Sequence, residues 1–179
     1  MKNTKPLLTG AWEWLDGASW SLYASSKQPP TSLCTAVSLI AISDLGSDQI
    51  VLTRNQRGLD LIAGHIEPGE LPIEALRRES LEEAGFTFEK ALLYGHAATT
   101  MTKRPTADSR AHKYPYPVNY VLHYYAFGSQ TAQPTGDEIL GSEIMTLSQL
   151  QDSAPDTELG RLITFMAKAG LDTAKSTRS

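Results

Sequence analysis

Apolar and polar residues follow one another along this chain in a pattern that predicts a mixed α/β protein. Strands are expected at residues 36–42, 50–53, 59–62, 91–100 and 118–127, where apolar residues run together or alternate. Two aromatic stretches, 12–15 and 20–23, flank Asp16 and Gly17, which predicts a hairpin. Since strands and helices do not alternate strictly, the pattern favours a mixed sheet packed between helices.

Two segments have the spacing of helices. Residues 72–84 form the clearer one: Pro72 suits a first helical turn, and Gly85 suits a left-handed stop. The preceding residues 67–70, Glu-Pro-Gly-Glu, predict a type II turn with Gly69 at its third position. Apolar residues at helical spacing predict a last helix that ends at Gly170; they are Leu159, Leu162, Ile163 and Met166.

The length of 179 residues is that of about one domain, and no long Pro/Gly/Ser-rich linker divides it. We expect three parts: an N-terminal extension with the hairpin at 1–30, a main domain at 31–170, and a tail at 171–179 that frays.

Composition narrows the class of protein. The chain is 41% hydrophobic and 20% charged with a net charge of −4, so a core can form. The negative balance argues against stable binding to nucleic acid by bulk electrostatics, whereas a small anionic ligand can meet a local basic patch. A monomer and a homodimer are both compatible with these numbers.

Cys34 is the only cysteine, which excludes a disulfide framework and a thiolate metal cluster and fits a reducing compartment. The longest apolar stretch, at 36–42, is far below the roughly 20 residues that span a bilayer. The first residues lack the apolar centre of a secretory signal. A cytoplasmic protein without a membrane partner is expected.

Three carboxylates are concentrated on the first predicted helix. Glu79, Glu82 and Glu83 stand at i, i+3 and i+4, and therefore on one face. Oxygen ligands of this kind favour Mg²⁺, with Mn²⁺ as a second choice, over zinc. The alternative is a solvated acidic face that Arg77 and Arg78 partly neutralise.

Residues 64–86 resemble the Nudix box, G-x5-E-x7-R-E-U-x-E-E-x-G-U, in which U is a bulky apolar residue. The matching positions are Gly64, Glu70, Arg78, Glu79, Glu82, Glu83, Gly85 and Phe86. At background residue usage, a chance match of this length is about a one-in-a-million event. Ser80 departs from the pattern, and we interpret it as a smaller core contact.

The resemblance implies an α/β/α sandwich that hydrolyses a nucleoside diphosphate linked to another group in the presence of Mg²⁺. It implies metal ligands at Glu79, Glu82 and Glu83, with the backbone carbonyl of Ala63 as a further one. It also implies that Arg78 and Glu70 brace the loop and orient Glu79.

The general base, which accepts the proton of the attacking water, has candidates at more than one position. Glu82 is the candidate within the box, and Glu138 or Glu143 is the candidate further along the chain. A surface glutamate near a strand end is the simpler interpretation of each of the last two.

Candidate substrate-binding residues lie on both sides of the box. Arg54 and Arg57 precede it; Lys103, Arg104 and Tyr116 follow in a loop rich in cationic side chains. Arginine and lysine suit phosphate, and a tyrosine ring can stack on a base. A solvated loop stiffened by proline explains the same residues.

Three functions are compared with these residues. The leading one is a pyrophosphohydrolase acting on a small nucleotide, either a nucleoside triphosphate, oxidised ones included, or a nucleoside diphosphate derivative. The alternative is a module that senses a nucleotide without cleaving it; such a module could lose its glutamates, and this chain keeps all three. An isomerase on a related fold needs a reactive cysteine, for which Cys34 is poorly placed.

Overall fold

The computed structural model describes residues 5–12, 15–43, 48–153 and 157–178. Its strands are β1 (Leu8–Ala11), β2 (Ala18–Ala24), β3 (Cys34–Ser43), β4 (Gln49–Asn55), β5 (Gly58–Asp60), β6 (Ile62–His65), β7 (Phe86–Met101), β8 (Val118–Gln130) and β9 (Gly141–Thr146). Its α-helices are α1 (Pro72–Ala84), α2 (Leu147–Ser153) and α3 (Glu158–Arg178), and its short 3-10 helices are η1 (Thr31–Leu33) and η2 (Arg110–Lys113).

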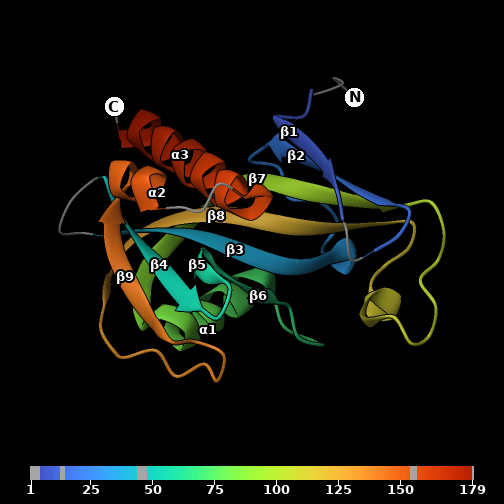
Figure 1. Cartoon of the computed structure of the whole chain (residues 1–179), viewed down its shortest axis with the longest axis horizontal. Helices are drawn as coiled ribbons and strands as arrows, with labels where there is room; N and C mark the ends of the chain where they lie inside the picture. The colour runs from blue at the N-terminus through green and yellow to red at the C-terminus, as the bar shows by residue number, and fades with distance from the viewer. Residues whose placement is uncertain (1–4, 13–14, 44–47, 154–156, 179) are drawn as a thin grey trace.

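All described strands belong to one mixed sheet (Figure 1). The order is β1-β2-β7-β8-β3-β4-β5, with β6 paired to β3 and β9 paired to β4. Only the β3–β8 pairing is parallel among the described strands. The hairpin of β1 and β2 is therefore an edge of the main sheet, joined to it along β7.

Helices cover both faces of the sheet, which confirms the predicted α/β/α sandwich (Figure 1). On one face Leu76 of α1 packs among Val37, Leu39 and Leu122, all fully buried. On the other face α3 packs against Ile40 and neighbouring residues of β3 and β4. Odd and even positions of β3 thus face different cores, as the alternation of a strand requires.

The end of the chain differs from the expectation. The last helix does not stop at Gly170 but continues to Arg178, so residues 171–178 are not a frayed tail. Leu171 and Ala174 extend its apolar stripe and are buried against the sheet. A Cβ at position 170 would lie 2.6 Å from a side-chain carbon of Ile40, so this glycine lets the helix approach the sheet.

Two strand predictions also change in detail. The hairpin is confirmed with Leu8–Ala11 as its first described strand, earlier in the chain than the expected stretch 12–15. Glu13 and Trp14 of that stretch lie outside the described residues. The strand expected at 59–62 is split at Leu61 into β5, which pairs with β4, and β6, which pairs with β3. At Leu61 the chain therefore passes from β4 to β3, two strands that are themselves paired.

The local signals around α1 are confirmed. The helix spans Pro72–Ala84, and Gly85 ends it in the left-handed conformation at φ 59°. Gly69 has φ 87° in the preceding turn. Ser80 is fully buried, and its hydroxyl donates to the carbonyl of Phe86 at 2.6 Å, so the unusual polar residue is satisfied within the core.

No helix among the described residues is both long enough and apolar enough to cross a membrane.

Candidate active site

Arg78 joins the turn before α1 to the acidic face of the helix. Its guanidinium holds both oxygens of Glu70 at 3.0 Å, and it donates to Glu79 Oε1 at 2.7 Å and to Glu82 Oε2 at 3.3 Å. A further bond, 2.9 Å long, goes to the carbonyl of His65 at the end of β6. The bond to Arg78 is the main cause that lowers the pKa of Glu70. These contacts are consistent with the bracing role that the box resemblance implies.

The carboxylate of Glu79 lies directly against the backbone of β6. A Cβ on Gly64 would come within 1.9 Å of the Glu79 carboxyl carbon, so only glycine leaves room for this contact. Gly64 matches the box in sequence, and this contact is the physical reason for a glycine at that position.

Glu83 is anchored on the neighbouring residue of the same strand. Its Oε2 accepts a hydrogen bond from the backbone N–H of Ala63 at 2.9 Å. The pKa of Glu83 is raised to about 7, mainly by burial and in smaller part by the negative charges of Glu79 and Asp60, while the hydrogen bond from Ala63 acts in the opposite direction. This part of the site therefore contains negative charge that its protein neighbours do not fully compensate.

Asp60 is an acidic residue of this site that the sequence analysis missed. It ends β5, accepts from the N–H of Leu61 at 2.9 Å, and has a pKa raised mainly by burial. Arg57 Nη2 lies 3.4 Å from its Oδ2. The only signal in the sequence was a lone aspartate between two apolar residues, which does not reveal that it faces a glutamate on a helix.

The glutamates fit a hard divalent cation in the chemistry of their donors and in their charge. The donor set is all oxygen, and the raised pKa of Glu83 reflects an environment that a cation would relieve. Within the described residues, no three acidic, histidine or cysteine side chains already surround one point. The physical reason is that Arg78 holds Glu79 and Glu82, while Glu83 is bound to the strand.

The stability of the metal-free protein is expected to depend on Glu83. Its folded-state pKa lies above its ordinary value of 4.5, so the folded protein retains a proton that the unfolded chain has lost. The free energy of unfolding should therefore fall as pH rises from 4.5 to about 7. We expect a decrease on the order of 1–3 kcal/mol, measured by urea unfolding in EDTA.

The matched variant Glu83→Gln should lack this part of the pH dependence. At pH 7.5, Mg²⁺ should raise the unfolding midpoint of the wild type more than that of the variant. Parallel pH profiles for the two proteins would contradict the assignment of the effect to Glu83.

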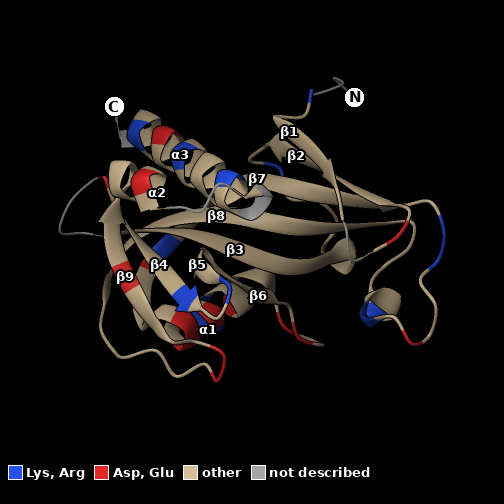
Figure 2. Ribbon diagram, viewed as in Figure 1, with Lys and Arg blue, Asp and Glu red and all other residues tan. Residues whose placement is uncertain are grey.

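The other predicted acidic residues have different surroundings. Glu143 Oε1 lies 2.5 Å from Arg54 Nε, so these two side chains are paired with each other. Glu138 lines a cavity of about 270 Å³ together with Asn55 and Arg57. Figure 2 shows the acidic residues of α1 beside basic residues at the end of β4. Arg57 and Glu138 thus share a pocket, whereas Arg54 and Glu143 form a separate ion pair.

Three predicted substrate residues lie together elsewhere. Lys103 is paired with Asp16 of the N-terminal hairpin region, and the Arg104 guanidinium lies 5.0 Å from the centre of the Tyr116 ring. Within the described part of the chain, no hydrogen bond or ion pair connects them to the box glutamates. Their binding role stays a prediction.

A second cavity next to the box was not foreseen. It has a volume of about 340 Å³, and its lining includes Trp12, Arg57, His65, Tyr114 and Asn119. The cation-rich loop between β7 and β8 reaches this cavity through Arg110 and Tyr114, whereas Lys103 and Arg104 do not line it. Tyr114 is in hydrogen-bond contact with His65 Nε2 at 2.5 Å, and the two rings are stacked at 5.7 Å.

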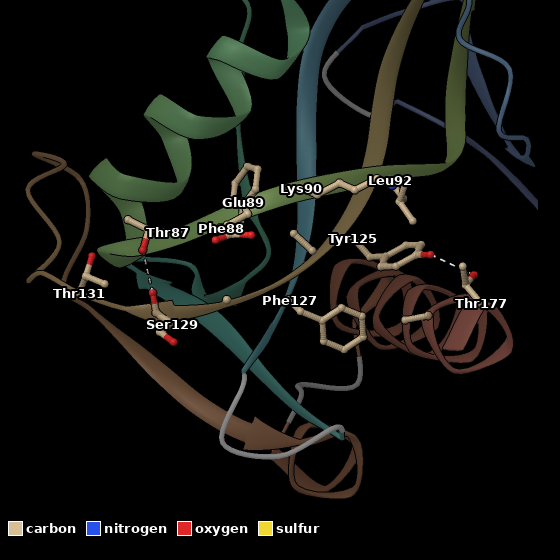
Figure 3. A pocket seen from close by; sticks show the side chains of 13 residues that line it. Thr87, Phe88, Glu89, Lys90, Leu92, Tyr125, Phe127, Ser129, Thr131 and Thr177 are labelled. Carbon is tan, nitrogen blue, oxygen red and sulfur yellow. Dashed lines mark hydrogen bonds between the residues drawn. The ribbon is translucent and has the colours of Figure 1, made fainter. Parts of the chain in front are cut away.

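A third cavity, of about 760 Å³, lies at the other end of the sheet (Figure 3). It is formed where β7 begins, β8 ends and α3 ends, and Tyr125 and Phe127 line it. The Tyr125 hydroxyl donates to Thr177 Oγ1 at 3.0 Å across one side. None of the box glutamates lines this cavity.

Comparison with known proteins gives a family and a fold. The sequence model of the NUDIX domain matches residues 33–164. A Bacillus subtilis pyrophosphohydrolase, BsRppH in a mutant form, has a similar structure with TM-score 0.60 and 18% identity, covering 88% of this chain and 92% of its own. A search of curated proteins gave no significant match.

Two further solved structures have the same fold. A NUDIX family hydrolase from Clostridium perfringens has TM-score 0.51 and 22% identity, covering 78% of this chain and 96% of its own. A NUDIX hydrolase from Nitrosomonas europaea has TM-score 0.50 and 22% identity, covering 76% and 90%. At these identities the likeness concerns the fold.

Proposed function

Because this chain belongs to the NUDIX family, we propose that it is a metal-dependent pyrophosphohydrolase acting on a small nucleotide. The substrate is a nucleoside triphosphate, oxidised ones included, or a nucleoside diphosphate derivative, and water attacks phosphorus. The observation that carries this proposal is the contact of Glu79 and Glu83 with successive residues of β6. A purely solvated acidic face would not need this contact.

Glu79, Glu82 and Glu83 would hold the metal, Mg²⁺ or Mn²⁺, with the Ala63 carbonyl as a further candidate ligand. When bound, such an ion neutralises pyrophosphate oxygens and lowers the pKa of water. Arg78 positions Glu79 from one side, and the absence of a side chain at Gly64 leaves space on the other.

Arg57 is the best-placed cation for the substrate's phosphates. Its side chain is 73% exposed, and it lines both cavities beside the box. Its contact with Asp60 is 3.4 Å long and involves an exposed guanidinium, so this ion pair contributes little to stability. The guanidinium is therefore available to bind an anionic ligand.

Two carboxylates are candidates for the base. Glu82 stands on α1 with a side chain 46% exposed, and Glu138 lies in the same pocket as Arg57. Glu143, the third candidate of the sequence analysis, is the weaker choice because Arg54 occupies its oxygen.

We expect Glu138→Gln to lower kcat about 10²-fold or more while leaving the affinity for Mg²⁺ unchanged, because a base contributes to the rate and not to metal binding. Steady-state release of phosphate or pyrophosphate measures kcat, and calorimetric titration measures metal affinity.

Glu143→Gln is the matched control and should retain kcat within about fivefold, since that carboxylate serves an exposed ion pair. If Glu138→Gln retains the wild-type rate, and Glu82→Gln loses rate without losing affinity for Mg²⁺, the base is Glu82.

The activity itself is tested with a panel of substrates. The protein is incubated with Mg²⁺ and nucleoside triphosphates, 8-oxo-dGTP, ADP-ribose, NADH and nucleotide sugars, and the products are identified by chromatography. The expected result is cleavage of at least one at a diphosphate bond, abolished by EDTA. Saturable binding of a nucleotide with no cleavage of any would overturn the proposal in favour of a sensing module.

A further inference from the structure

The cavity of about 340 Å³ beside the box is built from parts of the chain that are far apart in sequence. Its floor is the sheet face around Asn119 of β8 and Thr99 of β7, and one wall is Trp12, which follows β1. Tyr114, just beyond η2, supplies another part of the lining. Its volume is at the lower end of the range for small-molecule sites.

This cavity adjoins the candidate metal site directly. His65 lines it, and the carbonyl of the same residue accepts a bond from Arg78. Arg57 lines it as well and approaches Asp60, whose charge acts on Glu83. A molecule in the cavity with a phosphate chain directed past Arg57 would therefore reach the glutamates.

Asn119 lines this cavity, and its side chain has a hydrogen-bond donor without a partner among the described residues. Its side chain is only 4% exposed, and its Nδ2 has no hydrogen-bond partner. The Thr35 hydroxyl lies 3.4 Å from Asn119 Oδ1 and 3.3 Å from the carbonyl oxygen of Tyr120, and its single hydrogen can be donated to one of them at a time. An unsatisfied buried amide is unfavourable, and a ligand with an acceptor atom would relieve it.

Flat side chains form the walls. Trp12 is fixed by its indole N–H, which donates to Thr99 Oγ1 at 3.0 Å, and Tyr114 is fixed by its stacked contact with His65. Rings held in this way offer large apolar contact to a planar ligand at low cost in conformational entropy.

We propose that this cavity determines substrate specificity by receiving the substrate's base, with Asn119 Nδ2–H donating to a ring nitrogen or carbonyl on the base edge and Trp12 forming a wall. The inference rests on the proposed function. Trp12 lies outside residues 33–164, the part matched by the family, so the N-terminal hairpin contributes a determinant of its own. The cations Lys103 and Arg104 are not required for base recognition.

The test compares ligands that differ only in the base. AMP, GMP, CMP and UMP are titrated calorimetrically with Mg²⁺ present, and ribose 5-phosphate is the match without a base. None of these has a diphosphate to cleave. At least one nucleotide should bind about tenfold more tightly than ribose 5-phosphate, and Asn119→Leu, which keeps the size but removes the donor, should cancel most of that difference.

Trp12→Leu is a second variant at a half-buried position, and it should weaken every nucleotide while leaving ribose 5-phosphate unchanged. If Asn119→Leu does not fold, the binding measurements on Trp12→Leu test the proposal instead. Thr177→Val, in the distant cavity, is the matched control: it loses the bond from Tyr125 and should keep the wild-type preference. Equal binding of ribose 5-phosphate and all four nucleotides, or an unchanged preference in the folded variants, would overturn the proposal.

The two proposals fail separately. A protein that cleaves the substrate panel but has no preference for a base retains its proposed function and loses the base pocket. A protein that prefers a base through Asn119 but cleaves nothing retains the pocket and loses the hydrolase activity.

Discussion

Replacing Glu83 with glutamine is expected to lower kcat for nucleotide hydrolysis on the order of 10³-fold, with the fold intact. The amide cannot supply the anionic oxygen that a divalent ion requires, and loss of several kcal/mol of charge stabilisation has this effect on rate. The glutamine carbonyl can still accept from the N–H of Ala63, so the strand keeps its partner. Product release under saturating Mg²⁺ measures the rate, and circular dichroism with thermal unfolding checks the fold.

Glu89→Gln is the matched control because it removes the same charge from an exposed position of β7. It should retain the wild-type rate. A Glu83→Gln enzyme within about fivefold of wild type would contradict the role of Glu83 in metal binding.

Gly64→Ala is expected to lower kcat/KM by about 10²-fold or more, although the change is a single methyl group. The new Cβ would collide with the Glu79 carboxylate, whose carbon and oxygens would lie 1.9–2.3 Å away. Glu79 must then move by about an ångström, and a displacement of this size at a catalytic group has an effect of this order. Steady-state kinetics with a Mg²⁺ titration distinguishes lost metal affinity from lost turnover.

Gly69→Ala adds the same methyl group in the turn between β6 and α1, where nothing lies within 4 Å of the new atom. Its backbone has φ 87°, so the variant should lose about 1 kcal/mol of stability but keep most of its activity. If the two variants lose activity equally, the contact between Gly64 and Glu79 is not what matters.

Local features of the sequence were sufficient for the helix that carries the glutamates. Pro72, Gly69 and Gly85 each determine a backbone conformation that depends on few neighbours, and the observed α1 has the predicted bounds. For the same reason the one-face arrangement of Glu79, Glu82 and Glu83 followed from spacing alone.

Features that depend on distant partners were not predictable in this way. Strand β9 and helix α2 are stabilised by β4 and α3, and their own sequences have weak periodicity. Gly170 has the local character of a helix stop, but contact with Ile40 makes it a packing position inside α3. In each case tertiary packing outweighs local propensity.

The sequence by itself determined the family, the sandwich of a mixed sheet between helices, and the acidic face of α1, because these depend on composition, periodicity and a motif of fixed spacing. Only the tertiary structure decided which charges meet. It pairs Arg54 with Glu143, places Asp60 beside Glu83, and brings Trp12 and Asn119 to one cavity. Such contacts join residues separated by up to about a hundred positions, and pairings at that separation are determined by the register of the strands and the packing of the helices on them.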